Sequence, residues 1–259
     1  MINQFDFCEL KKQYLNNDPF DHVVIDDFWK ENIANELLYE MEETANNVRT
    51  FQMDNVTRYK SPLENKIVVP HWDLFKKTTY QAFTYLNSEF LPIIKSITNI
   101  DNLKPDVGLH GGGLHFHPTN GNLNVHKDYS IHPKLGKMRK LNIIVYMNPI
   151  WKDEWNGNLE FWSHDDEHNQ PKEKIKSIKP SFNRAVIFDV SQNGWHGLPE
   201  YTKQPKDVYR QSMALYYLIE PLSDIENRAK ALFAPREDQK NDESIRQLIK
   251  DRTKITWTL

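Results

Sequence analysis

The 259-residue chain carries 33 Lys and Arg against 36 Asp and Glu, a formal net charge of −3. This balance argues against a general nucleic-acid-binding protein, which normally shows an excess of basic residues. Cys8 is the only cysteine, so the sequence excludes a disulfide framework and a thiolate metal site. No signal peptide is evident, and no stretch approaches the ~20 apolar residues that cross a bilayer, so we expect a cytoplasmic protein without a membrane segment.

Residues 1–104 are predicted to be mainly helical support around one short strand. Val23 to Ile25 form an apolar run that is typical of an edge strand. Apolar residues then recur every four positions from Ile33 to Ala45, which places them along one face of a helix. A second helix is expected from Trp72 to Phe90, with Pro92 interrupting or ending it.

From about Pro105 the pattern changes to short β-like runs separated by turn residues. The runs are Leu114 to His117, Leu123 to His126, Leu141 to Met147, Leu159 to Trp162, Ala185 to Asp189 and Gln211 to Ile219. Such spacing predicts an all-β sandwich or barrel over residues 105–221. Residues 222–259 are expected to form a charged, helical C-terminal extension. Because no repeat or low-complexity linker divides the chain, we expect a single domain over residues 1–259.

His126 ends one of these runs, and Asp128 lies two positions after it. On an extended segment such residues project to the same side, so one ion can contact both. His196 follows in a glycine-flanked turn or strand start. Two imidazoles and one carboxylate are a ligand set that holds divalent iron and leaves positions open. These three residues are therefore the predicted metal site.

A competing metal site begins at His115-Phe116-His117, since the metal site of a cupin also starts with two histidines in this spacing. A cupin would require a glutamate shortly afterwards, and residues 118–121 supply none. The sequence therefore favours the set that contains His126.

The last predicted strand alternates strictly from Arg210 to Tyr217, which places Arg210 and Ser212 on one face. A guanidinium binds a carboxylate through two hydrogen bonds, and a nearby serine can donate a third. The alternative is an arginine on an edge strand, paired with a surface carboxylate. The position of His196 just upstream favours the ligand interpretation.

In this order of residues, the segment from roughly Asp106 to Glu220 resembles the Fe(II)- and 2-oxoglutarate-dependent oxygenases, in particular the prolyl 4-hydroxylase-like branch. The shared features are His126-x-Asp128, the strand Leu141–Asn148, the turn and strand Asn156–Trp162, the strand Ala185–Phe188, His196 and Arg210-x-Ser212. Pro19 to Phe28 also looks like the leading segment of many members. The resemblance implies a mainly β fold with helical support, whose core is a double-stranded β-helix (a jelly roll, cupin-like).

The resemblance implies that His126, Asp128 and His196 bind Fe(II), with no catalytic residue beyond these ligands. It further implies that Arg210 holds the distal carboxylate of 2-oxoglutarate, with Ser212 beside it.

Three more residues are implied as co-substrate contacts. Tyr146 matches a tyrosine whose hydroxyl joins the arginine, and the parity of the strand places Asn142 on the same face. His117 matches a position that approaches the other end of the co-substrate.

The chain departs from the family pattern in two places. Asn156-Gly157 stands where the family has two glycines, and asparagine tolerates the left-handed backbone that this turn needs. The interval from His196 to Arg210 is longer than usual, which predicts an extended loop able to alter the substrate entrance. Lys206, in that loop, is the nearest alternative cation, but its polar surroundings favour Arg210.

The implied activity is a dioxygenase that converts 2-oxoglutarate and O2 to succinate and CO2 while hydroxylating an unactivated C–H bond. The expected substrate is a prolyl residue or free proline, and ascorbate is a further cofactor that the resemblance suggests. Two alternatives stay open: a hydroxylase of another small molecule or sugar, and a catalytically silent jelly-roll binding protein. The sequence indicates no oligomeric state.

A cationic segment joins two of the predicted strands and, by the same resemblance, is expected to fold over the substrate. Its four cations are Lys134, Lys137, Arg139 and Lys140. They fit either an acidic peptide or phosphorylated substrate, or a solvated loop, which is the more common role of such a run.

Overall fold

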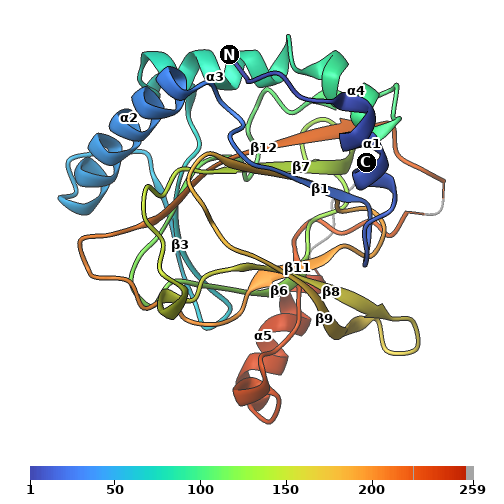
Figure 1. Cartoon of the computed structure of the whole chain (residues 1–259). Helices are drawn as coiled ribbons and strands as arrows, with labels where there is room; N and C mark the ends of the chain where they lie inside the picture. The colour runs from blue at the N-terminus through green and yellow to red at the C-terminus, as the bar shows by residue number, and fades with distance from the viewer. Residues whose placement is uncertain (224, 255–259) are drawn as a thin grey trace.

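The computed structural model describes residues 1–223 and 225–254 and is built around one curled antiparallel sheet (Figure 1). Its strands are β1 (His22–Ile25), β2 (Thr57–Lys60), β3 (Glu64–Val69), β4 (Lys104–Pro105), β5 (Gly113–His117), β6 (Asn122–Lys127), β7 (Met138–Tyr146), β8 (Leu159–Asp165), β9 (Gln170–Ile178), β10 (Arg184–Asp189), β11 (Trp195–Leu198), β12 (Arg210–Ile219) and β13 (Leu232–Phe233). Across the described residues the strand order is β1-β10-β7-β12-β5-β3-β6-β11-β8-β9, with β2 on β3, β4 on β12 and β13 on β6.

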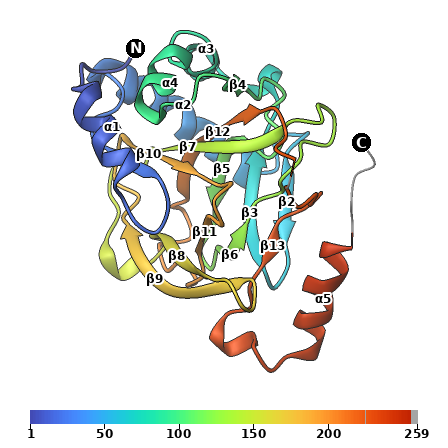
Figure 2. The same ribbon diagram turned by 90° about the vertical axis from the view of Figure 1, so that its right-hand side faces the viewer.

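The sheet folds back on itself at β3, which pairs with β5 at one end and with β6 at the other. One layer therefore contains β1, β10, β7, β12 and β5, and the facing layer contains β6, β11, β8 and β9. Figure 1 shows the two layers one above the other, and Figure 2 shows β3 and β13 at the side of the barrel. The mainly β fold with a jelly-roll core is thus confirmed.

Helices cover the outer face of the first layer. They are α1 (Phe7–Leu15), α2 (Glu31–Arg49), α3 (Lys77–Asn87) and α4 (Leu91–Thr98), while α5 (Glu243–Thr253) projects from the other side of the barrel (Figure 1). Short 3-10 turns are η1 (Trp72–Leu74), η2 (Asp153–Trp155) and η3 (Glu237–Gln239). No helix in the described ranges is long and apolar enough to span a bilayer.

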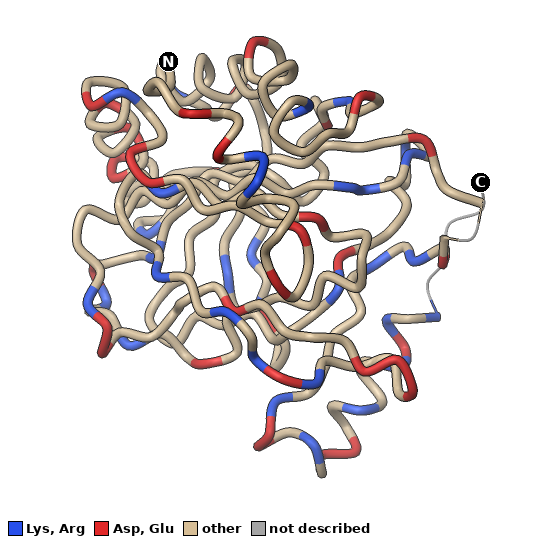
Figure 3. The backbone as a smooth tube through the Cα atoms, turned by 45° about the vertical axis from the view of Figure 1, so that its right-hand side comes forward, with Lys and Arg blue, Asp and Glu red and all other residues tan. Residues whose placement is uncertain are grey.

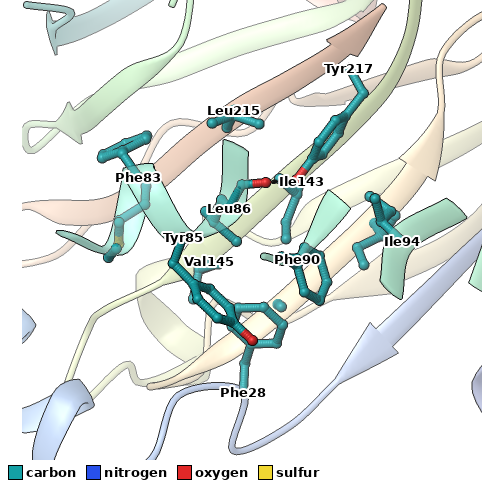
Figure 4. Close-up of a cluster of buried hydrophobic side chains, with 14 of the residues drawn as sticks. Phe28, Phe83, Tyr85, Leu86, Phe90, Ile94, Ile143, Val145, Leu215 and Tyr217 are labelled. Atoms are coloured by element: carbon teal, nitrogen blue, oxygen red, sulfur yellow. Dashed lines mark hydrogen bonds between the residues drawn. The ribbon is translucent and has the colours of Figure 1, made fainter. Parts of the chain in front are cut away.

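The main hydrophobic core lies between these helices and the first layer (Figure 4). Along β7, Ile143 and Val145 point toward the helices. Because side chains alternate along a strand, Ile144 and Tyr146 face the barrel interior instead. The Tyr217 hydroxyl, from β12, donates to the Leu86 carbonyl at 2.8 Å and ties α3 to the sheet. The core thus fixes which side chains of β7 and β12 point inward.

The helix predicted from Trp72 to Phe90 is wrong in its bounds. The structure has η1, then α3, then a separate α4 in which Pro92 lies in the first turn. Proline is well tolerated there because the first helical N–H groups have no partner within the helix. Pro92 therefore begins a helix rather than ending one.

Residues 1–104 and 222–259 contribute more to the sheet than the sequence predicts. β3 lies in the middle of the strand order although its first half is polar, and its buried Glu64 is paired with Lys66 and Arg252. β13 is only two residues long, but Phe233 pairs directly with His126. β9 was also not predicted, because it is a largely exposed edge strand without apolar alternation.

Candidate active site

Two neighbouring strands of the second layer carry the three predicted metal ligands. His126 lies on β6, Asp128 directly follows that strand, and His196 lies on β11, where it pairs with His126 in the antiparallel register. Asp128 Oδ1 is 3.7 Å from His126 Nε2, and its Oδ2 is 3.6 Å from His196 Nε2. One ligand atom of each residue lies within 4.8 Å of the others. Strand pairing thus brings together residues 70 positions apart in the sequence.

Backbone carbonyls orient both imidazoles. The Asn124 carbonyl is 2.9 Å from His126 Nδ1, and the Gly194 carbonyl is 2.8 Å from His196 Nδ1. Because a carbonyl can only accept, each Nδ1 carries the proton, and each Nε2 presents a free lone pair beside the carboxylate. Burial, and then the neighbouring His126, lowers the pKa of His196 to about 3, so this ring stays neutral. The donor set therefore fits a divalent metal.

The Asp128 carboxylate is held by a buried cation and an amide. Asn142 Nδ2 donates to Asp128 Oδ2 at 3.0 Å, Arg139 Nη2 lies 3.3 Å from the same oxygen, and Arg139 Nε donates to Asn142 Oδ1 at 3.0 Å. Burial raises the pKa of Asp128, but the charge of Arg139 and the two histidines outweigh it, so this pKa lies well below its ordinary value. Asp128 is therefore ionised and fixed in direction.

Arg139 does not belong to a cationic loop, as the sequence had suggested. It lies on β7, is buried, and stacks 3.3 Å from the Tyr216 ring centroid and 4.8 Å from that of Tyr129. The sequence did not predict this position, because β7 begins at Met138, three residues before the apolar run that starts at Leu141. A shift in the register against β12 also separates Arg139 from that run.

The other cations of that segment are mostly paired. Lys137 contacts Glu220, and Lys140 lies 2.6 Å from Asp189. Of the four, only Lys134 has no carboxylate within 4.0 Å among the described residues. Along the whole chain, residues of both signs are interspersed (Figure 3). The segment therefore offers no concentrated positive patch to an acidic substrate.

Arg210 is a buried cation at the start of β12, only 2% exposed. β12 lies between β7 and β5, so the interpretation as an edge-strand arginine is wrong. Its Nε donates to the Gly157 carbonyl at 2.6 Å and its Nη2 to the Tyr146 hydroxyl at 3.3 Å. No carboxylate in the described ranges lies within 4.0 Å of Arg210. Lys206, the alternative cation, is exposed. A buried, uncompensated guanidinium is costly unless an anion binds it.

The turn beside Arg210 depends on left-handed backbone. Asn156 has φ 56° and Gly157 has φ 79°. A Cβ on Gly157 would lie 3.0 Å from Thr202 and 3.2 Å from Arg210 Cδ. The asparagine therefore replaces a glycine without loss of the turn, and the glycine lets its carbonyl reach the guanidinium.

The remaining predicted co-substrate contacts divide between the two ends of the site. Tyr146 contacts Arg210, and Ser212 lies opposite Tyr146 on the neighbouring strand. Asn142 contacts Asp128 instead, so its position is at the metal ligand. His117 pairs directly with Arg210 across β5 and β12, which places it at the arginine end and not at the other end.

The long interval between His196 and Arg210 closes the barrel behind Arg210. The Thr202 hydroxyl donates to the Pro118 carbonyl at 2.8 Å, and Gln204 Nε2 donates to the His117 carbonyl at 3.0 Å. Both Thr202 and Gln204 are buried. The loop is thus attached to the turn between β5 and β6, at the arginine end of the barrel.

A cavity of about 560 Å³ lies elsewhere, between α2 and the segments around residues 148–155 and 207–211. Its β12 residue is Gln211, which points away from the face that carries Arg210. None of its lining residues belongs to the predicted site.

Comparison with known proteins identifies relatives of the central segment. Residues 112–218 match the model of the 2OG-Fe(II) oxygenase superfamily. Prolyl 3-hydroxylase OGFOD1 of Mus musculus is 27% identical over 192 residues, which are 72% of this chain but 31% of that protein. The chain therefore spans only about a third of the length of this curated relative.

Two solved structures are similar in fold. A prolyl-4-hydroxylase of Pseudomonas putida has a TM-score of 0.55 at 11% identity, covering 84% of this chain and 100% of that one. A prolyl hydroxylase from Trichoplax adhaerens, in complex with a peptide fragment of the hypoxia inducible factor oxygen degradation domain, has a TM-score of 0.53 at 13% identity, covering 82% and 90%. At such identities the likeness shows the fold alone.

We predict that Arg139→Met weakens divalent metal binding about 10- to 100-fold, because a group that orients a metal ligand is removed. Without this cation, burial raises the pKa of Asp128, so protons compete with the metal and the loss grows as the pH falls. Calorimetric titration with Mn(II) measures the effect. Lys134→Met, in the exposed loop, is the matched control, and equal affinities of the two variants would contradict the assignment.

A second prediction concerns His115, which lies on β5 opposite Ser212. Burial, and then the charge of Lys66, lowers the pKa of His115 from 6.5 to about 3. Between these values the unfolded chain binds a proton that the folded chain does not, so stability falls as the pH drops below 6.5. This group alone costs about 2 kcal/mol at about pH 5.

Urea unfolding of the wild type and of His115→Gln, each at about pH 7.5 and about pH 5, measures this contribution. We expect the variant to lose less stability on acidification, by about 2 kcal/mol. An identical pH dependence in both proteins would show that His115 does not titrate in this way.

Proposed function

We propose that this chain, whose residues 112–218 match the model of the 2OG-Fe(II) oxygenase superfamily, is an Fe(II)- and 2-oxoglutarate-dependent hydroxylase. The observation that carries the proposal is the convergence of His126, Asp128 and His196 in one buried cluster, with a second buried charge, Arg210, that has no carboxylate partner among the described residues. A catalytically silent binding protein would not need both features intact.

The metal end is formed by two imidazoles that backbone carbonyls orient and by one carboxylate that Arg139 and Asn142 hold. His126 and His196 would bind Fe(II) through Nε2, and Asp128 through its carboxylate. When bound, Fe(II) and 2-oxoglutarate supply, with O2, the oxidant that acts on a C–H bond. Arg139 and Asn142 hold the carboxylate in place, and Arg228 Nη1 donates to the Asp128 backbone carbonyl at 2.9 Å.

The co-substrate end is formed around Arg210. Its Nε is committed to Gly157, so its remaining N–H groups face the hydroxyl of Tyr146 and the interior. These donors suit the distal carboxylate of 2-oxoglutarate, with Ser212 on the same face. Ascorbate is proposed only as an accessory cofactor of the enzyme.

The preferred substrate is a prolyl residue or free proline. Support comes from the mouse relative, which is a prolyl 3-hydroxylase. Tyr129 and Tyr216 stack on Arg139, whose guanidinium contacts Asp128, so two aromatic rings lie close to the metal ligands. Hydroxylation of another small molecule or sugar is the alternative, because one scaffold supports many substrates.

We predict that the purified protein, supplied with Fe(II), 2-oxoglutarate and O2, forms succinate, and that His126→Ala or Asp128→Ala abolishes this. Each change removes one of three metal ligands. Succinate is measured by mass spectrometry, alongside a screen of prolyl peptides and proline for the gain of one oxygen atom. Absence of both metal binding and turnover in the wild type would overturn the proposed function.

The co-substrate assignment has its own test. Arg210→Ala should weaken 2-oxoglutarate binding at least about 100-fold, because a charge-assisted pair worth about 3 kcal/mol or more is lost in a buried site. Metal affinity should change little, since Arg210 contacts none of the three ligands. Lys206→Ala is the control on the exposed loop. A larger loss of 2-oxoglutarate affinity in Lys206→Ala than in Arg210→Ala would show that Lys206, and not Arg210, binds the carboxylate.

A further inference from the structure

We propose that His117 is a third anchor for the distal carboxylate of the dicarboxylate co-substrate, beside Arg210 and Tyr146. The inference rests on the proposed function and assigns to this chain a specificity-determining residue at the arginine end of the barrel. It predicts that His117 recognises the carboxylate and not the keto acid that would bind at the metal.

The register places His117 beside the guanidinium. His117 and Arg210 are directly paired residues of antiparallel strands, so their side chains project to the same face. That face is the barrel interior, because Arg210 there contacts Tyr146 of the next strand. Both side chains are almost completely buried, at 2% exposure each. A carboxylate held by Arg210 would therefore lie next to the imidazole.

The imidazole of His117 lacks the hydrogen bonds that buried histidines normally make. Neither Nδ1 nor Nε2 has a partner among the described residues. The other buried histidines of the described ranges each have at least one bonded ring nitrogen; they are His22, His115, His126, His132 and His196. An unpaired buried polar group destabilises the fold unless a ligand satisfies it. Its orphaned nitrogens point to a ligand.

Charges around His117 keep the ring neutral and the pocket positive. Burial, then Arg210 on β12, Lys66 on β3 and His115 on the same strand lower the pKa of His117 well below its ordinary value. The Arg210 carbonyl opposes this shift without reaching hydrogen-bond geometry.

A neutral imidazole carries one N–H that can donate to a carboxylate. Of these cations, Lys66 is paired with the carboxylate of Glu64, at 3.6 Å. The surroundings therefore favour an anionic ligand over a neutral one.

The long loop holds this end of the pocket in place. Gln204 donates from Nε2 to the His117 carbonyl, and the Thr119 hydroxyl donates to the Gln204 carbonyl at 2.9 Å. Gln204 Oε1 is buried and, like the imidazole, has no partner in the described ranges. Gln204 is thus a positioning residue that attaches the loop to the end of β5 beside His117.

The test compares ligands with and without the distal carboxylate. With Mn(II) bound, calorimetry measures the affinity of the wild type, His117→Leu and His117→Gln for 2-oxoglutarate and for 2-oxobutanoate, which has the same keto acid but no second carboxylate. We expect His117→Leu to weaken 2-oxoglutarate binding at least about 10-fold, the cost of one good hydrogen bond to a charged group, and to leave 2-oxobutanoate unchanged. His117→Gln retains a donor and should recover part of the loss.

Thermal unfolding of the ligand-free proteins separates recognition from structure. Leucine removes an unsatisfied polar group, so His117→Leu should keep or raise the Tm while reducing the Tm increase that 2-oxoglutarate produces. His22→Leu is the matched control, because it removes a buried histidine whose Nδ1 is bonded to the Phe20 carbonyl. That control should lower the Tm and leave the affinity for 2-oxoglutarate unchanged.

Several outcomes would overturn the inference. Unchanged 2-oxoglutarate affinity in His117→Leu would exclude an anchoring role, and an equal loss for both acids with a lower Tm would assign His117 a structural role. If His117→Leu does not fold, the ratio of the two affinities in His117→Gln decides. A wild type that binds no 2-oxoglutarate with metal present would instead refute the proposed function itself.

Discussion

The ionic contact between Arg139 and Asp128 is the interaction on which the rest of the site depends. In the interior of the protein, an isolated carboxylate would take up a proton rather than remain charged, because its burial is not compensated. Arg139 reverses this outcome, and the stacking of its guanidinium on Tyr216 and Tyr129 holds it in the interior. Asp128 is thereby available as an anionic ligand beside the two imidazoles.

Electrostatic compensation differs between the two ends of the barrel. At the metal end, Asp128 has a cation, an amide and two histidines around it. At the other end, Arg210 has only neutral partners in the described ranges. A divalent metal and a dicarboxylate would together satisfy both ends. The interior thus has an anionic metal-ligand set at one end and a cation without an anionic partner in the described ranges at the other. This arrangement suits a dicarboxylate that is bound to the metal at one end and to Arg210 at the other.

Segments outside the barrel strands stabilise both ends. Phe233 of β13 stacks on the His126 ring at 5.2 Å, and Ser130, after Asp128, exchanges hydrogen bonds with Arg228. At the arginine end, Gly157 supplies a carbonyl and the Thr202–Gln204 segment closes the barrel. The chain after β12 and the long loop before it therefore support the two ends of the site.

The sequence predicted the parts of the site that follow from local periodicity. The spacing of His126 and Asp128 on a strand and the alternation around Arg210 correctly placed these side chains on inward faces. Arg139 could not be predicted, because a register shift brings it inward and the surrounding cations resemble a loop. The true positions of His117 and Asn142 depend on which strands pair, and β3 was not predicted because its first half is polar.

The most direct measurement is the location of metal and co-substrate in crystals of the intact protein soaked with Mn(II) and 2-oxoglutarate. Anomalous scattering should place a single Mn(II) within bonding distance of His126 Nε2, His196 Nε2 and the Asp128 carboxylate. The density should place one carboxylate of the co-substrate on Arg210. A metal bound elsewhere, or a carboxylate that does not contact Arg210, would contradict the account.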